Sequence, residues 1–132
     1  MIYLDTAALV KLVRREVESD ALVDWIAGQP DELLVSSVLA EVELPRALRR
    51  TEPALLAAVP GVLGRIAVYE IDELVRTTAA AYDNTAVRSL DAIHLATADA
   101  VLGDDLTAFV TYDRRLRAAA EDLGMPVAAP SG

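Results

Sequence analysis

The sequence predicts an α/β protein, and three observations carry that prediction. Short apolar runs of strand length recur along the chain, helical patterns lie between them, and the runs do not alternate between polar and apolar residues. Strands of this kind are typical of a parallel sheet that helices cover on both faces. We therefore expect a three-layer α/β/α sandwich around a mainly parallel sheet of four to five strands.

The candidate strands are short apolar runs bounded by polar residues, and the last of them is the weakest. In chain order they are residues 2–4, 33–35, 66–71, 109–112 and 127–129. The segments between them repeat apolar residues at helical spacing. The expected helices are residues 6–15, 19–27, 37–50, 53–63, 73–87, 91–102 and 114–123.

Length and composition limit the class of protein. The chain has 132 residues, of which 54% are hydrophobic and 25% charged, and no Ser, Gly or Gln tract marks a linker. We expect a single globular domain over residues 1–132. The absence of cysteine excludes disulfides, thiol nucleophiles and cysteine-ligated zinc. No signal peptide or run of membrane-spanning length is recognisable, so we expect a soluble, cytoplasmic protein.

The net charge of −9 has the wrong sign for a module that holds nucleic acid by bulk electrostatics. Acids that are local to a metal site, with arginines gathered elsewhere, would offset this. Arginines do cluster at Arg46, Arg49 and Arg50, and again at residues 114–117.

Two aspartates follow candidate strands. Asp5 ends the first strand, and Asp113 follows the run "FVTY" of the fourth. In an open parallel sheet, ligands bind beyond the carboxyl ends of the strands. Either residue alone is readily explained as a helix N-cap, but as a pair they indicate a shared site at one edge of the sheet.

A third aspartate, Asp91, opens the segment "DAIHLATADAVL" on the same helical stripe as His94 and Leu95. A carboxylate on an apolar stripe is costly unless it is paired or binds a metal. The alternative is a helix-capping role, because the helix begins here.

The helix over residues 37–50 carries Glu41 and Glu43, which point to opposite sides, and periodicity does not decide between them. His94 is the only histidine, and its apolar stripe favours a hydrogen-bonded core residue over a catalytic base. Hydrolysis would therefore need a metal to activate water. Hard ions such as Mg²⁺ and Mn²⁺ take oxygen ligands of the kind that a carboxylate cluster offers.

Four segments, in order, resemble one family over nearly the whole chain: "YLDTAALVKL", "VSSVLAEVELPRAL", "LDAIHLATA" and "FVTYDRRL". They resemble the PIN-domain ribonucleases and, within them, the VapC-type toxins of toxin–antitoxin pairs. The resemblance implies a PIN-like fold and a metal-dependent endoribonuclease, in which a metal-activated water cleaves an RNA phosphodiester.

The resemblance also implies which residues form the site. Asp5, Glu43, Asp91 and Asp113 take the catalytic positions, with Asp5, Asp91 and Asp113 as ligands of Mg²⁺ or Mn²⁺. Glu43 is preferred to Glu41 because the family's glutamate stands shortly before an Arg-Ala pair. Thr6 and Thr111 would support the site, whereas Ala7 stands where the family often has serine.

The expected partners follow from the same resemblance. A cognate antitoxin would inhibit the protein, two copies would form a homodimer, and no membrane is involved. Independently of the resemblance, Arg46, Arg49 and Arg50 follow Glu43 closely enough to contact the phosphates of the RNA substrate. The alternative is that these arginines only solvate their helix or pair with Glu52. Apolar residues of the helices over 6–15 and 53–63 would form a groove for the antitoxin. These residues are Leu9, Leu12, Leu55 and Leu56.

Two other functions are compatible with the residues. One is a PIN-like module that has lost activity and only binds a partner. The other is a phosphoacceptor receiver domain, which normally needs a lysine at the end of a late strand. The only lysine is Lys11, in the first expected helix, and this disfavours the receiver.

Overall fold

Five parallel strands form one sheet in the order β3-β2-β1-β4-β5 in the computed structural model, which describes residues 1–132. β1 lies at the centre, where Ile2 is in register with Leu34 of β2 and with Ala108 of β4. The predicted α/β class with a parallel sheet is confirmed. The strands are β1 (Ile2–Leu4), β2 (Leu34–Ser37), β3 (Ala67–Tyr69), β4 (Ala108–Val110) and β5 (Val127–Ala128).

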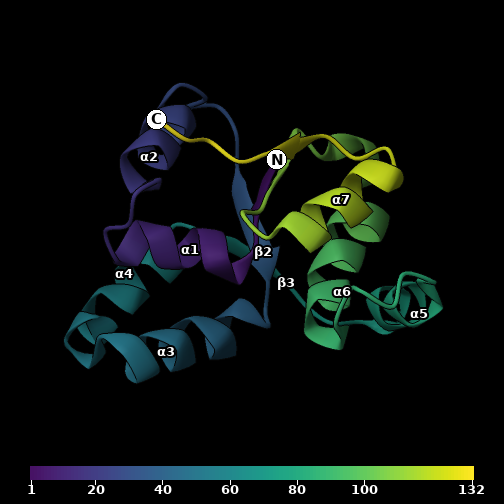
Figure 1. Ribbon diagram of the computed structural model, residues 1–132, viewed down its shortest axis with the longest axis horizontal. Helices are drawn as coiled ribbons and strands as arrows, with labels where there is room; N and C mark the ends of the chain where they lie inside the picture. Colours follow the sequence, from purple (N-terminus) through teal and green to yellow (C-terminus); the bar gives the residue numbers. More distant parts are fainter.

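Helices cover both faces of this sheet, as Figure 1 shows. One layer contains α1 (Thr6–Val13), α2 (Ser19–Ala27), α3 (Ala40–Thr51), the 3₁₀ segment η1 (Pro53–Ala58) and α4 (Val59–Leu63). The other contains α5 (Glu73–Ala81), α6 (Ser89–Ala96), its π-helical continuation η2 (Thr97–Leu102) and α7 (Arg114–Asp122). A short 3₁₀ turn, η3 (Gly103–Asp105), leads into β4. None of these helices combines the length and apolarity needed to cross a membrane.

Each layer of helices has its own apolar core, because alternate residues of β1 point to opposite faces of the sheet. Ile2 and Leu4 join the core beneath α1, α2, α3 and α4, whereas Tyr3 joins the core beneath α6 and α7. Tyr3 is fully buried and stacks on Phe109 with ring centroids 5.3 Å apart. This alternation places a hydroxyl-bearing side chain directly under α6.

The leucines that we expected to form a groove for a partner serve this chain's own core. Leu9 is fully buried, and Leu12, Leu55 and Leu56 pack against the same cluster. Leu9 is therefore not available to a partner, whereas a groove formed by the partly exposed Leu12, Leu55 and Leu56 stays a prediction.

Several predicted boundaries were also wrong, for local reasons. β2 runs two residues further than predicted because the Ser36 hydroxyl donates to the Leu4 carbonyl at 2.7 Å, which allows serine to be buried. The next helix begins at Ala40 instead of residue 37, since Ser37 belongs to the strand. The helix predicted over 53–63 divides into η1 and α4, with Pro60 in the first turn of α4, where a missing N–H is tolerated.

Other helices differ in their ends. The helix predicted over 6–15 stops at Val13, and that predicted over 73–87 stops at Ala81. The Asn84 side chain then accepts a hydrogen bond from the Ala86 N–H and forms a turn. The helix predicted over 91–102 begins at Ser89 and changes to a π-helix at Thr97.

Candidate active site

The candidate site lies at the carboxyl ends of the two central strands. Leu4 of β1 is in register with Val110 of β4, so that Asp5 and Asp113 follow the strands at the same edge of the sheet. The Asp5 N–H donates to the Val110 carbonyl at 3.3 Å and continues the pairing by one residue. The topology therefore brings together two acids that are far apart in the sequence.

Asp5 is the buried member of the group, with 4% of its surface exposed. It caps α1, because its Oδ1 accepts a hydrogen bond from the Ala8 N–H at 2.9 Å. Burial raises the pKa of Asp5 above its ordinary value, and the nearby Asp91 charge also raises it, against the opposing effects of Thr111, the Ala8 N–H and His94. Asp5 thus caps α1, and burial disfavours the charged form of its carboxyl group.

Glu43 reaches the site from α3. Its Oε1 accepts a hydrogen bond from the Thr6 hydroxyl at 2.6 Å and lies 2.8 Å from His94 Nε2. Burial alone would raise the pKa of Glu43, but the hydrogen bonds from His94 and Thr6 outweigh burial and lower it. Glu41 is exposed and makes no such contact. The structure thus places Glu43, and not Glu41, beside Thr6 and His94.

His94 is buried and hydrogen-bonded, as its apolar stripe predicted. Its Nδ1 lies 2.7 Å from the Tyr3 hydroxyl, and its Nε2 also lies 3.2 Å from the Thr6 hydroxyl. A hydrogen bond to the Glu43 carboxylate requires a hydrogen on Nε2. In a neutral ring, Nδ1 is then the acceptor for the Tyr3 hydroxyl.

Sequence reasoning missed the role of Tyr3 in this chain of contacts. The available signal was a tyrosine inside a buried strand, since a buried phenolic hydroxyl usually has a hydrogen-bond partner. The side chains form a relay from Tyr3 through His94 to Glu43, with Thr6 as a second donor to the same carboxylate oxygen.

The other two acids are more accessible. Asp91, in the first turn of α6, is only half-buried, although its stripe predicted burial. Burial raises the pKa of Asp91, and so do the Asp113 and Glu43 charges, against the opposing effects of His94 and Arg88. Asp5, Glu43 and Asp113 thus each interact electrostatically with Asp91.

Asp113 is exposed and caps α7, with Oδ1 accepting from the Arg115 N–H at 2.8 Å and the Leu116 N–H at 3.1 Å. Thr111 is fully buried, and its hydroxyl accepts a hydrogen bond from the Asp113 N–H at 3.2 Å. Thr111 therefore acts on both acids that follow the central strands, because its hydroxyl also lowers the pKa of Asp5.

The donor set suits a hard divalent cation in its chemistry. All four acids offer carboxylate oxygens, and Asp91 accepts no hydrogen bond from the chain, while Oε2 of Glu43 and Oδ2 of Asp113 are likewise free of such bonds. No group of three or more acidic or histidine side chains is drawn together at metal-binding distances. The residues thus fit a metal site by the type of their donor atoms.

Arg46 and Arg50, one helical turn apart on α3, line a hollow that also contains Thr6 and Glu43. Arg49 is exposed and does not line this hollow. Two of the three arginines predicted to contact phosphate therefore face the site.

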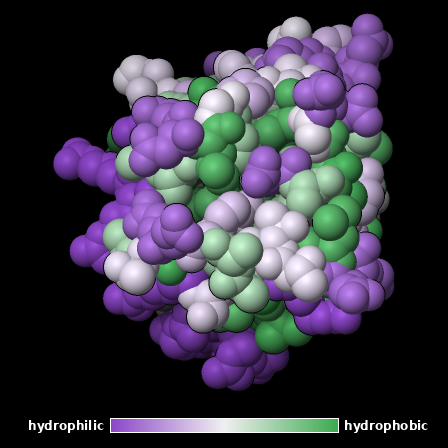
Figure 2. Space-filling view, turned by 90° about the vertical axis from the view of Figure 1, so that its right-hand side faces the viewer, coloured by the Kyte–Doolittle hydropathy of each residue, from purple (hydrophilic) through white to green (hydrophobic).

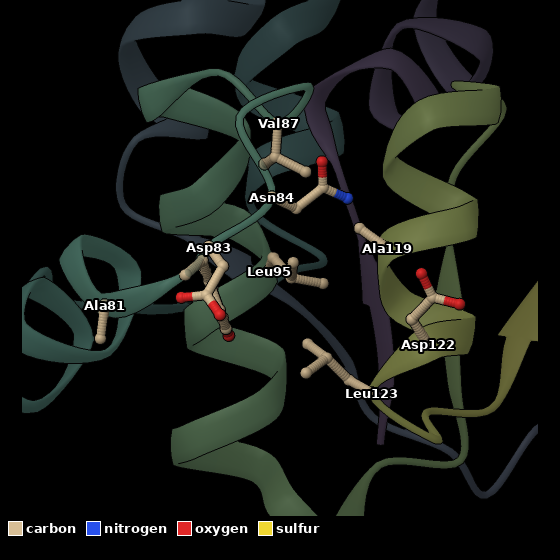
Figure 3. A pocket seen from close by; sticks show the side chains of 9 residues that line it. Ala81, Asp83, Asn84, Val87, Leu95, Ala119, Asp122 and Leu123 are labelled. Carbon is tan, nitrogen blue, oxygen red and sulfur yellow. The ribbon is translucent and has the colours of Figure 1, made fainter.

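Another hollow, with a volume of about 410 Å³, is lined by none of the four acids of the candidate site. It opens between α7 and the segment that joins α5 to α6, with Leu95 and Leu123 inside and Asp122 on the α7 side (Figure 3). On the face formed by α5, α6 and α7, apolar residues are interspersed with polar ones (Figure 2). This hollow does not gather the four acids and is not the candidate site.

Comparisons with known proteins agree with the architecture. A family model for the PIN domain matches residues 2–122. Ribonuclease VapC35 of Mycobacterium tuberculosis (strain CDC 1551 / Oshkosh) is 57% identical over 131 residues, covering 98% of this chain and 97% of the relative. Ribonuclease VapC46 of M. tuberculosis (strain ATCC 25618 / H37Rv) is 44% identical over 130 residues, covering 98% of each. The crystal structure of FitAcB from Neisseria gonorrhoeae matches with a TM-score of 0.67 at 22% identity over 96% of both chains, which shows the shared fold.

Proposed function

The chain belongs to the PIN-domain family as a VapC-type ribonuclease, and we propose that Asp5, Glu43, Asp91 and Asp113 form its active site around Mg²⁺ or Mn²⁺. One observation carries this proposal: the parallel sheet brings Asp5 and Asp113 to the same edge, where Asp91 of α6 and Glu43 of α3 meet them from opposite layers. Hard cations bind oxygen ligands, and this edge of the sheet supplies them.

The four acids have different tasks in this proposal. Asp5, Asp91 and Asp113 would hold the cation, which would supply an activated water for attack on phosphorus. Glu43 stays ionised to a lower pH than an ordinary glutamate, because His94 and Thr6 donate to its carboxylate. It therefore stays a charged carboxylate beside the cation, and its Oε2 accepts no hydrogen bond from the chain.

The substrate is RNA, and the bond that is hydrolysed is a phosphodiester. Arg46 and Arg50 line the hollow beside Glu43 and would contact the RNA backbone on that side. Arg49 points elsewhere and would contribute little. The alternative of an inactive binding module is disfavoured, because all four acids are present and the buried relay holds one of them in place.

The protein acts as the toxin of a toxin–antitoxin pair in this proposal. Its partners are a cognate antitoxin, which would cover the acidic site, and a second copy of the chain in a homodimer. If an antitoxin side chain competes with the metal for the acids, inhibition weakens as the concentration of Mg²⁺ rises. Co-purification with the product of a neighbouring gene, followed by cleavage assays over a Mg²⁺ series, tests this mode. Inhibition that does not depend on Mg²⁺ would contradict it.

The decisive experiment compares the purified protein with its Asp5→Asn variant. We expect the wild-type protein to cleave RNA with Mg²⁺ or Mn²⁺ and to lose activity in EDTA, and the variant to be inactive but folded by circular dichroism. Sequencing of RNA ends after brief expression of each protein identifies the target. Full activity in the folded Asp5→Asn variant would overturn the site assignment.

A further inference from the structure

We propose that Arg88 and Arg115 form a second phosphate-binding rim, which holds the RNA backbone on the side of the site formed by Asp91 and Asp113. The proposal rests on the proposed function and extends it. Its basis is a hollow that is lined by both arginines and by both aspartates. This rim lies apart from Arg46 and Arg50, which line the hollow beside Glu43.

Local structure ties each arginine to one of the acids. Arg88 is the N-cap residue of α6, three positions before Asp91, and its backbone is extended. Arg115 is the second residue of α7, and its N–H donates to Asp113 Oδ1 at 2.8 Å. The elements that position the two acids therefore also position the two guanidinium groups.

Neither guanidinium group is engaged within the chain. Both side chains are exposed and neither forms an ion pair or a side-chain hydrogen bond, whereas Arg14 and Arg15 each pair with an acid at 2.8 and 2.7 Å. Arg88 lies close enough to Asp91 to lower the pKa of that carboxyl without bonding to it. The donors of both groups are therefore free to bind an external acceptor.

The chemistry of the acceptor follows from the donors. Planar guanidinium groups bind phosphate through paired N–H donors, and a polyanion satisfies several of them at once. The acids lie between the two arginine pairs, since Glu43 shares one hollow with Arg46 and Arg50, and Asp91 and Asp113 share the other with Arg88 and Arg115. A single RNA strand that contacts both rims would cross the acidic site and present a phosphodiester to it.

The test measures RNA binding separately from cleavage. Arg88→Ala and Arg115→Ala, each in the Asp5→Asn background, are titrated with a fluorescent single-stranded RNA by anisotropy over a series of salt concentrations. Neutralising one phosphate contact on a single strand contributes about 0.7 to the slope of log affinity against log salt. We expect each variant to weaken binding several-fold and to reduce the slope by about that amount, and the corresponding lysine variants to retain most of the slope.

Arg65→Ala is the matched control. Arg65 is exposed, makes no ion pair, and precedes β3, which places it at the amino edge of the sheet. The Arg65→Ala variant should leave the affinity for RNA and the slope of log affinity against log salt unchanged. In the otherwise wild-type protein, Arg88→Ala and Arg115→Ala should raise KM and leave kcat nearly constant. This is the result of losing a contact that binds the substrate and the transition state equally well.

The outcomes separate the rim from the proposed function. Unchanged affinity and slope in both alanine variants, beside an active wild-type enzyme, would overturn the rim alone. A fall in kcat with constant KM would also overturn it, because the arginines would then act on the acids and not on the RNA. If the wild-type protein binds RNA through these arginines but does not cleave it, the rim stands and the proposed function fails.

Discussion

Replacing Tyr3 with phenylalanine tests the relay that orients Glu43. The substitution keeps the buried ring, which stacks on Phe109, and removes only the hydroxyl that lies 2.7 Å from His94 Nδ1. His94 is 2% exposed, so water cannot replace the lost partner without a change in packing. A buried acceptor left without a donor costs about 1–3 kcal/mol.

That loss is large enough to measure in a chain of 132 residues. A destabilisation of about 2 kcal/mol should lower Tm by about 6–10 °C. Urea unfolding and thermal melts of Tyr3→Phe give the free-energy change directly. Tyr69→Phe is the control, because its hydroxyl contacts only the Met1 sulfur at 3.5 Å, and its effect should stay within about 0.5 kcal/mol.

Activity should fall as well, since Nε2 of His94 would no longer be fixed as the donor to Glu43. Thr6 still donates to the same carboxylate, which limits the loss to about tenfold in kcat. Nitrogen chemical shifts of the His94 ring, measured by NMR, report which nitrogen carries the hydrogen. The reasoning is refuted if Tyr3→Phe is as stable as Tyr69→Phe, or if the wild-type ring carries its hydrogen on Nδ1 alone.

Three further predictions follow from single residues. Asp5→Asn retains the capping oxygen but removes a buried charge, so that the metal-free variant should melt above the wild-type protein at neutral pH. Because burial raises the pKa of Asp5, the stability of the wild-type protein falls as pH rises through that pKa. The difference in Tm between the variant and the wild-type protein should therefore grow from acidic to neutral pH. A variant that melts below the wild-type protein at neutral pH would contradict this. Glu43→Gln should abolish metal-dependent RNA cleavage while Glu41→Gln retains most of it, and cleavage assays that give the reverse order would reject the Glu43 assignment. Lys11→Met should destabilise the protein by about 1 kcal/mol in urea unfolding, and by less at high salt, because Lys11 pairs with Glu16 and Glu18. A loss that does not change with salt would contradict the two ion pairs as its source.

The fold class was predictable because its signals are local. Apolar runs separated by helical patterns need no knowledge of distant contacts, and the parallel sheet follows from them. β2 was harder, since Ser36 and Ser37 look like the end of a strand. Their burial depends on partners elsewhere in the fold, such as the Leu4 carbonyl that accepts from Ser36.

The arrangement of the candidate site was predictable in part, again because some of its signals are local. Asp5 and Asp113 end their segments visibly, and a shared sheet edge follows from the topology. The contact between Tyr3 and His94 joins residues 91 positions apart, and no periodicity encodes it. Likewise, the choice between Glu41 and Glu43 depends on the rotation of α3 against α1 and α6, which only the packed structure fixes.

The distribution of charge explains how an acidic chain would meet RNA in the proposed arrangement. The net charge of −9 is a sum over the whole surface, but at physiological ionic strength charges are screened over about 8 Å. Lys11, Arg14 and Arg15 are neutralised by neighbouring acids, whereas Arg46, Arg50, Arg88 and Arg115, like the other arginines, form no ion pairs within the chain. An RNA strand at the site would therefore be attracted by four free guanidinium groups, while the acidic remainder of the surface would repel strands bound elsewhere. On this reasoning, the negative charge outside the two rims favours the binding of RNA across the acidic site over its binding elsewhere on the surface.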